Sequence, residues 1–259
     1  MFKTKLLVIA LGAAFAMPVL AEDAPAAAPS PVTGNVGIVS DYIYRGLTQT
    51  SHAPAIQGGF DYAHASGFYA GVWGSNVSWI ADSGAVSVAT GNYGPTMELD
   101  TYFGFKGTVM ADVAYDVGAV RYNYLGSGYT PAAGFANADT AEAYVGVTYS
   151  IVTLKYSYGL LDRFLTTPNA GGTGYADLTV NYPVESLGAT VIAHAGRQHF
   201  NIGPTDTFSY SDYKLAVTKD FGGYVAGLAY TNTNVSPSWT YGNQNWGKAA
   251  VAVTLTHAM

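Results

Sequence analysis

Hydrophobic and polar residues alternate with a period of two along most of this chain. In one representative run, Leu178 and Val180 alternate with Asp177 and Thr179. Successive side chains of a β-strand point to opposite faces of the sheet, so this alternation predicts strands with one apolar face and one polar face. The chain is therefore predicted to be all-β.

The alternation recurs in twelve segments that are separated by residues typical of turns. The fifth segment is less regular, because its apolar parity changes between Val117 and Val120. A β-bulge at Gly118 would account for that change. The twelve predicted strands span residues 34–46, 54–62, 67–75, 97–106, 109–124, 140–149, 153–161, 174–182, 187–196, 208–219, 224–231 and 247–259.

Long and short connections alternate between these segments. Outer-membrane β-barrels have short periplasmic turns and long outer loops, whereas a soluble β-sandwich has no reason to alternate loop length. In hydrocarbon every backbone amide must be paired within the protein, so a spanning sheet has to close on itself. We therefore predict a transmembrane, antiparallel, up-and-down β-barrel of about twelve strands, with both termini on the periplasmic side.

Composition agrees with this class. Charged residues make up 11% of the chain, against about 25% in an average soluble domain, and hydrophobic residues make up 49%. Beyond residues 1–21 no apolar run reaches the length of about eighteen residues that a transmembrane helix needs. Cysteine is absent, which excludes disulfides, thiolate metal sites and cysteine nucleophiles.

The first residues have the features of an export signal. Lys3 and Lys5 precede an apolar stretch, and small residues before Glu22 provide a cleavage site. We expect cleavage near Ala21-Glu22 and a location in the outer membrane of a Gram-negative bacterium. The predicted parts of the chain are a signal peptide at 1–21, a flexible periplasmic lead-in at 22–33 and the barrel at 34–259.

Cleavage would leave nine basic residues against seventeen acidic ones, a formal charge of −8. An acidic chain without clustered Lys and Arg is not expected to bind nucleic acid. The expected partners are outer-membrane lipid and lipopolysaccharide, the barrel-insertion machinery and periplasmic chaperones during biogenesis, and small hydrophilic solutes.

Several motifs in the first predicted hairpins resemble the TorF-type porin family of proteobacterial outer membranes. They read SDYIYRG at 40–46, PAIQGGFDY at 54–62 and GFYAGVWGSN at 67–76, with similar residues at 98–100 and 115–124. The resemblance covers essentially the whole mature chain and implies an outer-membrane barrel with a pore. One departure is Met259, which stands where such barrels commonly end on an aromatic residue, although its parity is that of Val253 and Leu255.

Charged residues on the polar parity are the candidates for a pore lining. A wet, somewhat acidic interior would favour cations, by the logic of charged rings in channels, and allow passive diffusion of small hydrophilic solutes or ions. The alternative is a structural or surface-interaction barrel whose interior is plugged by ion pairs. The pore-lining candidates are Asp41, Arg45, Asp61, Glu98, Asp100, Asp112, Asp116, Glu142, Lys155, Asp177, Asp212, Lys214 and Lys248.

The longest predicted loop, at 76–96, is the candidate constriction, and Trp79, Asp82 and Tyr93 are its candidate residues. The tryptophans, together with tyrosines on the strands, are interpreted as a girdle at the membrane interface, where amphipathic rings settle. The strand tyrosines in question are Tyr42, Tyr44, Tyr122, Tyr124, Tyr156 and Tyr158.

Enzyme chemistry is not expected. The sequence contains neither HExxH nor GxSxG, which are signatures of zinc proteases and of serine hydrolases. His64 and Ser66 have a suitable spacing for a base and a nucleophile, but they fall in a predicted periplasmic turn. We therefore predict no catalytic residue, no metal site and no cofactor.

Overall fold

The computed structural model describes residues 30–87, 94–126, 130–203, 208–236, 239–241 and 244–259. The predicted signal peptide lies outside these residues, and so does the predicted lead-in as far as residue 29. Val32 and Thr33, assigned to that lead-in, already belong to the first strand. Within the described residues no helix is both long and apolar enough to cross a membrane.

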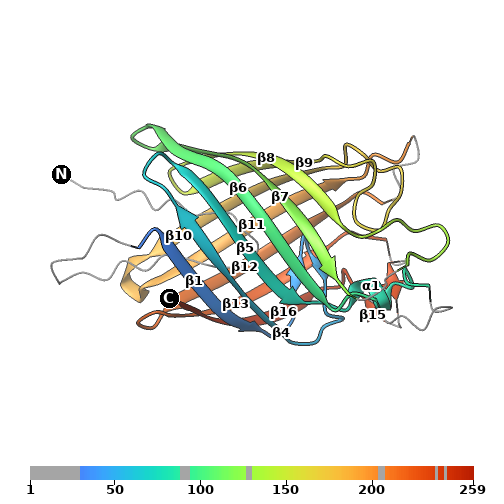
Figure 1. Cartoon of the computed structure of the whole chain (residues 1–259). Coiled ribbons are helices and arrows are strands. Elements are labelled where there is room, and N and C mark those ends of the chain that lie inside the picture. Colours follow the sequence, from blue (N-terminus) through green and yellow to red (C-terminus); the bar gives the residue numbers. More distant parts are fainter. Residues whose placement is uncertain (1–29, 88–93, 127–129, 204–207, 237–238, 242–243) are drawn as a thin grey trace.

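Twelve antiparallel strands form one closed barrel (Figure 1). Neighbouring strands follow one another along the chain, and the barrel closes where the first strand pairs with the last. The predicted fold, an antiparallel up-and-down barrel of twelve strands, is confirmed. The strands are β1 (Val32–Val39), β4 (Ala55–Ala63), β5 (Phe68–Asn76), β6 (Met97–Met110), β7 (Val113–Leu125), β8 (Thr140–Tyr149), β9 (Val152–Gly159), β10 (Gly174–Val184), β11 (Ala189–His199), β12 (Tyr210–Asp220), β13 (Tyr224–Thr233) and β16 (Ala250–Ala258).

The two ends of the barrel differ. β1 starts and β16 finishes at one rim, where the amide of Met259 donates to Gly34 O at 2.7 Å. This rim, the terminal end, also carries the short turns, one of which includes the 3₁₀ helix η2 (Glu185–Leu187). The opposite rim, the loop end, carries the long connections (Figure 1). The alternation of short turns and long loops is thus present in the structure.

Three local predictions were wrong. The first strand does not run to residue 46, because the chain leaves the barrel wall after Val39. β6 continues to Met110, so the turn predicted at residues 107–108 lies instead at 111–112. Gly118 is not bulged, since it pairs in regular register with Gly104 and Tyr144; the register shift lies between Thr108 and Met110.

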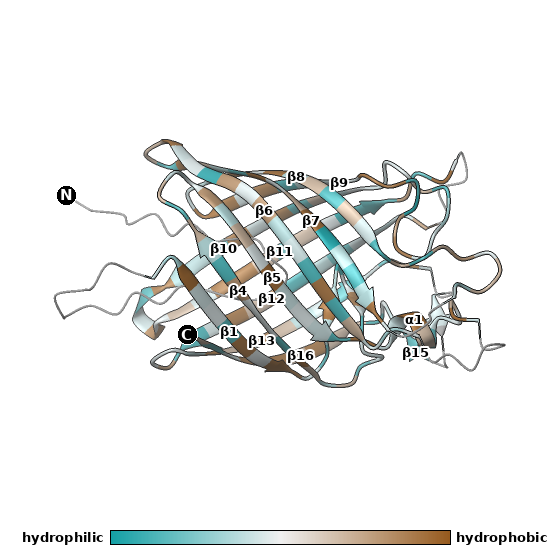
Figure 2. Cartoon of the chain, viewed as in Figure 1, coloured by the Kyte–Doolittle hydropathy of each residue, from teal (hydrophilic) through white to brown (hydrophobic). Residues whose placement is uncertain are grey.

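The outer face of the barrel is apolar, and the alternation of apolar and polar residues along the strands is visible in Figure 2. On β16, Val251, Val253 and Leu255 are 60%, 55% and 43% exposed, whereas Ala252 between them is buried. Tyrosines at both ends of the strands also face outward: Tyr62, Tyr149, Tyr182 and Tyr224 towards the terminal end, and Tyr156, Tyr158, Tyr213 and Tyr230 towards the loop end.

The predicted composition of the girdle was only partly right. Tyr156 and Tyr158 do face outward, but Tyr42, Tyr122 and Tyr124 are buried inside, and Trp73 points inward from β5. The change of apolar parity within residues 109–124 would require a β-bulge at Gly118, and β7 has none there. With regular register, the even-numbered residues of β7 point inward.

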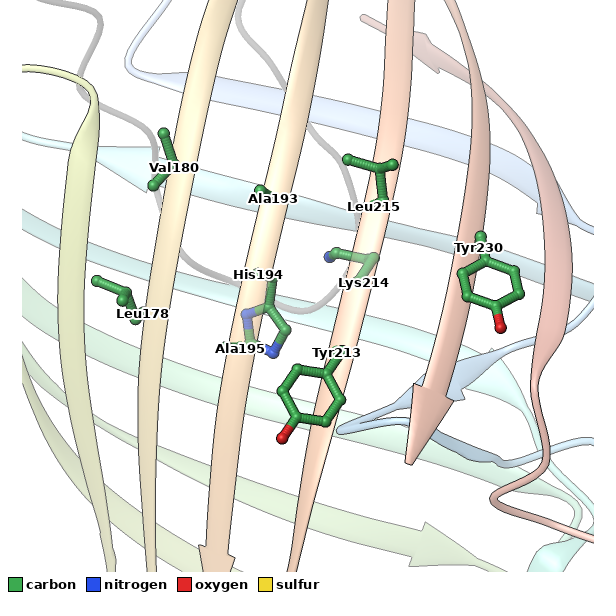
Figure 3. Close-up of a pocket in the computed structure, with 9 residues that line it drawn as sticks. All are labelled: Leu178, Val180, Ala193, His194, Ala195, Tyr213, Lys214, Leu215 and Tyr230. Atoms are coloured by element: carbon green, nitrogen blue, oxygen red, sulfur yellow. The ribbon is translucent and has the colours of Figure 1, made fainter. Parts of the chain in front are cut away.

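A shallow apolar depression interrupts the outer face over β10 to β13 (Figure 3). It forms because Ala193 and Ala195 are small, while Leu178, Tyr213 and Leu215 stand around them. His194 lies between the two alanines in sequence and therefore points to the opposite face, into the barrel. The depression lies on the outer surface, where its large apolar lining residues are exposed.

The connections at the loop end pack together as a cap. The cap includes the short helix α1 (Trp79–Asp82) and the small hairpin of β14 (Thr240–Tyr241) and β15 (Gln244–Asn245). The ring of Trp79 meets those of Tyr124 and Trp246 edge-on, with ring centroids 5.3 and 6.5 Å apart. Tryptophans that were expected at the membrane interface therefore form the apolar core of this cap.

The two faces of β16 make a matched test of orientation. Arg at position 253 would place a charge in lipid, so V253R should destabilise the fold by about 2–4 kcal/mol. Thr254 points inward, and T254R should be tolerated. Denaturant titration of both variants refolded in lipid vesicles, followed by the heat-dependent gel shift, measures the difference. Equal losses of stability would contradict the assignment of faces.

Candidate functional site

The interior of the barrel has two kinds of wall. β1, β13 and β16 are neighbours, and their inward side chains are small and neutral: Asn35, Gly37, Val39, Val225, Gly227, Ala229, Thr231, Ala252, Thr254 and Thr256. The strands from β6 round to β12 carry most of the charge. Polar chemistry in the interior is therefore concentrated on one side.

Most of the predicted pore-lining residues lie inside the barrel. Inward-facing wall residues are Asp61, Glu98, Asp100, Asp116, Glu142, Lys155, Asp177, Asp212 and Lys214. Asp41 and Arg45 are also buried, but they belong to the segment that follows β1 and not to the wall. Two candidates lie elsewhere: Asp112 is exposed in the turn after β6, and Lys248 is exposed in the connection before β16. The periodic pattern was extended into both connections, which is why they were misplaced.

A row of tyrosines and glycines crosses four strands on the charged side. Tyr69, Gly104, Gly118 and Tyr144 are successive partners in the registers of β5, β6, β7 and β8. The two rings lie over the two glycines, and the phenol oxygens meet 2.5 Å apart. A Cβ at Gly104 would lie 2.5 Å from Tyr69 Oη, and one at Gly118 would lie 2.6 Å from Tyr144 Oη. The glycines therefore leave space for the rings to lie flat against the wall.

The rings of this row also contact charged side chains. Tyr69 Oη donates to Asp116 Oδ1 at 2.6 Å. The ammonium of Lys155 lies 4.0 Å from the centre of the Tyr144 ring, and that of Lys106 lies 5.3 Å from the Tyr69 ring. Lys106 shares the inward parity of Glu98 and Asp100 on β6, although it is not among the predicted pore-lining residues.

The most unexpected feature of the interior is the segment 40–54, which we call the finger. It folds inward between β1 and β4 and carries a hairpin of β2 (Ile43–Tyr44) and β3 (Leu47–Thr48). Arg45 and Gly46 form its two-residue tip. Both have positive φ, 47° and 78°, as a type I′ turn requires. Asn and Gly are the usual residues there, so Arg45 occupies a backbone conformation that Arg seldom adopts.

The finger spans the interior near the loop end. Tyr42 Oη donates to Glu98 on β6 at 2.9 Å, and Tyr44 Oη donates to Tyr122 on β7 at 3.2 Å. Arg45 reaches Glu142 on β8 at 2.7 Å. Counted round the barrel, β8 lies on the side opposite β1, from which the finger emerges. Through the Arg45 side chain, the finger therefore reaches across the interior.

The backbone at the tip packs closely against β12 and β13. A Cβ at Gly46 would lie 2.7 Å from Asp212 Cβ and 2.4 Å from Thr233 Cγ2. At the base of the finger, Asp41 accepts hydrogen bonds from Thr48 Oγ1 at 2.5 Å and pairs with His52 Nδ1 at 2.7 Å. Arg45 pairs with Glu142 of the wall, whereas Asp41 pairs with His52 within the finger.

Two of the predicted constriction residues, Trp79 and Asp82, lie beside the finger. Trp79 is buried in the cap, and Asp82 accepts a hydrogen bond from Ser51 Oγ at 2.5 Å. Tyr93 lies outside the described residues. The amides of Ser78 and Trp79 donate to Gln49 O, so the start of the connection at 77–96 contacts the finger.

A second polar cluster lies on β10 to β12. His194 Nε2 lies 2.9 Å from Asp212 Oδ1, and His194 Nδ1 lies 3.4 Å from Asp177 Oδ2. Tyr175 Oη donates to Asp212 Oδ2 at 2.9 Å. Among the described residues no group of three or more His, Asp or Glu side chains is arranged to hold a metal ion. The cluster is a set of ion pairs and hydrogen bonds.

Comparison with known proteins places this barrel. Residues 23–259 match the profile of the Gcw_chp family, described as a bacterial protein of unknown function. The chain belongs to this family. No curated protein matches its sequence.

Solved structures of similar fold are porins. The KdgM porin aligns with a TM-score of 0.53 at 5% identity, covering 87% of this chain and 97% of KdgM. The NanC porin aligns with a TM-score of 0.52 at 8% identity, covering 88% of this chain and 98% of NanC. A further KdgM structure is a complex with disordered oligogalacturonate. This Gcw_chp protein therefore has a porin-like barrel fold.

The packing of the tyrosines against the glycines in this row can be tested by adding a methyl group at Gly118. G118A should destabilise the barrel by about 1–3 kcal/mol, because the new methyl group overlaps Tyr144 and the backbone of Phe103. Gly146 also points inward, but a Cβ there would have no neighbour closer than 3.8 Å. G146A should therefore be close to neutral. Denaturant midpoints of the two refolded variants compare them, and a G118A midpoint equal to that of G146A would refute the packing role of the row.

Proposed function

We propose that this protein is an outer-membrane channel for the passive diffusion of small hydrophilic solutes or ions, with a weak preference for cations. The observation that carries the proposal is the imbalance of charge inside a closed barrel with an apolar outer face. Among the described residues, the interior carboxylates outnumber the interior Lys and Arg side chains two to one: Asp41, Asp61, Glu98, Asp100, Asp116, Glu142, Asp177 and Asp212, against Arg45, Lys106, Lys155 and Lys214.

The location follows the same reasoning. An apolar band on the outer face with tyrosines at both of its ends suits a lipid bilayer, and the leader at residues 1–21 suits export. We propose the outer membrane of a Gram-negative bacterium, with the terminal end in the periplasm. The resemblance of the motifs at 40–46, 54–62 and 67–76 supports a TorF-type porin. No chemical step is part of this function.

The solute class differs from that of the solved KdgM complex. Oligogalacturonate is a polyanion, and an interior with an excess of carboxylates repels polyanions. Asp100 Oδ1 and Glu142 Oε1 are buried near the loop end and have no hydrogen-bond partner among the described residues. Small cations or neutral solutes fit this interior better.

The finger supports a second candidate function. Since it crosses the interior and contacts the opposite wall, the barrel could be a structural or surface-interaction protein with a plugged interior. Under the channel proposal the same finger is the constriction, in place of the connection at 76–96. The two candidates differ in one measurable property, which is whether the folded protein passes ions.

Single-channel recording tests the channel. We expect discrete current steps from the refolded full chain in a planar bilayer under a salt gradient, with a reversal potential on the cation-selective side. The double variant E98Q/D100N removes two of the interior carboxylates nearest the loop end and should move the reversal potential towards zero. A folded sample that passes no current would favour the plugged barrel.

Shortening the finger tests the constriction. The amide of Gln49 donates to Tyr42 O at 2.6 Å, so a Gly-Gly link can replace residues 43–48 between them. This variant should raise the single-channel conductance, because the tip no longer crosses the interior. Deletion of residues 77–94 is the control and should raise it less. The reverse order would restore the connection at 76–96 as the constriction.

A further inference from the structure

The surroundings of Arg45 form a cage for a guanidinium group. Arg45 Nη1 donates to Gln198 Oε1 at 2.8 Å, and Nη2 donates to Glu142 Oε2 at 2.7 Å. The guanidinium carbon lies 4.2 Å from the centre of the Tyr175 ring and 4.8 Å from that of Tyr44. The Arg45 side chain is only 7% exposed. Two acceptors and an aromatic face are the groups that recognise a planar guanidinium.

The wall side of the cage does not depend on Arg45 for its geometry. Gln198 Nε2 donates to Gly174 O at 3.0 Å, which turns the amide oxygen of Gln198 towards the cage. Tyr122 Oη donates to Glu142 Oε2 at 3.1 Å. Tyr175 Oη donates to Asp212, so its ring is held as well. The barrel wall would therefore still present the acceptors and the Tyr175 face if Arg45 withdrew.

Arg45, the occupant of the cage, has by contrast a backbone conformation that is unfavourable for Arg. Arg45 is at the tip of a two-residue hairpin with φ of 47°, where Asn, Asp or Gly would suit the backbone better. An Arg at this position contributes nothing to the turn. Its identity is explained by the cage that its side chain fills, and its strained backbone favours release when another ligand can fill the cage.

We propose that this cage is the solute-recognition site of the channel, that it takes guanidinium-bearing solutes, and that Arg45 is a tethered occupant which the solute displaces. Displacement releases the Arg45 side chain of the finger from Glu142 and Gln198 and opens the constriction. The inference rests on the proposed function for its transport step, but the cage itself is a binding site that can be tested alone.

Guanidinium is favoured over ammonium by the geometry. The two acceptors come from different strands, β8 and β11, and meet two different nitrogens of one planar group. An ammonium is a compact point charge that neither spans two such acceptors in one plane nor stacks on Tyr175 in the same way.

Vacating the cage tests the site directly. In the refolded full-length R45A variant, ethylguanidinium should bind saturably in a calorimetric titration, because the cage is empty, and ethylammonium should bind more weakly. R45A/E142Q loses the charged acceptor and should bind ethylguanidinium about tenfold more weakly or worse. R121A is the control, since Arg121 is half-exposed beside Asp139 at 3.6 Å, and its removal should create no binding.

The result that overturns the inference is an R45A protein, folded by the heat-dependent gel shift, that shows no saturable binding or binds equally well without the Glu142 carboxylate. If R45A does not refold, the wild-type protein supplies the measurement. Ethylguanidinium should change the near-ultraviolet circular dichroism of the tyrosines around Arg45 at concentrations where ethylammonium does not, and identical responses would overturn the proposal.

Current recordings separate this inference from the proposed function. In R45A, ethylguanidinium should reduce ion current with the same dependence on concentration as binding. Binding without any current in wild type or variant would refute the channel and leave the cage as a site of the plugged barrel. Current that ethylguanidinium does not alter, in a variant that does not bind it, would refute the cage and leave the channel.

Discussion

The structure depends on the pairing of β1 with β16. In a bilayer each unpaired backbone group costs several kcal/mol, so a sheet can cross only if it has no free edge. Here β1 pairs with β4 on one side and with β16 on the other, from Asn35↔Ala258 to Val39↔Thr254. The amides of Gly34 and Met259 complete the seam by exchanging hydrogen bonds. Once the seam is closed, every strand residue faces either the outside of the barrel or its interior, which requires the period-two pattern.

Closure also encloses charged side chains inside the barrel. Charged side chains taken from water need partners or solvent, and this interior collects more carboxylates than cations. Tyrosines of the wall supply some of these partners. They lie flat over glycines and donate hydrogen bonds to carboxylates, as Tyr69 does to Asp116 and Tyr102 does to Asp61. The finger supplies others. Arg45 brings a cation to Glu142, and Tyr42 brings a donor to Glu98.

The finger and the wall are therefore complementary surfaces within one chain. The acceptors for Arg45 are positioned by contacts within the wall, whereas the tip of the finger is held in an unfavourable backbone conformation. Under the channel proposal, these contacts would hold the constriction in one closed form. Arg45 also places a cation beside Glu142, among the interior carboxylates.

The sequence by itself determined the barrel. Alternation at positions such as Leu178 and Val253, together with the regular change between short and long connections, required twelve antiparallel strands with the lipid face on one parity. These features are local, since the pleat of a strand and the length of a turn are determined by residues that are adjacent in sequence. The inward parity of Glu98, Asp116 and Asp212 followed for the same reason.

Only the tertiary structure decided what fills the barrel. Tyr42 and Tyr44 continue the alternation of β1, so the pattern could not reveal that the chain leaves the wall after Val39. The partners of Arg45 lie on strands about 100 and 150 residues away along the chain, and they meet only because the closed barrel brings β8 and β11 opposite the finger. Periodicity reports which face a residue occupies; which residues meet across the interior is set by closure.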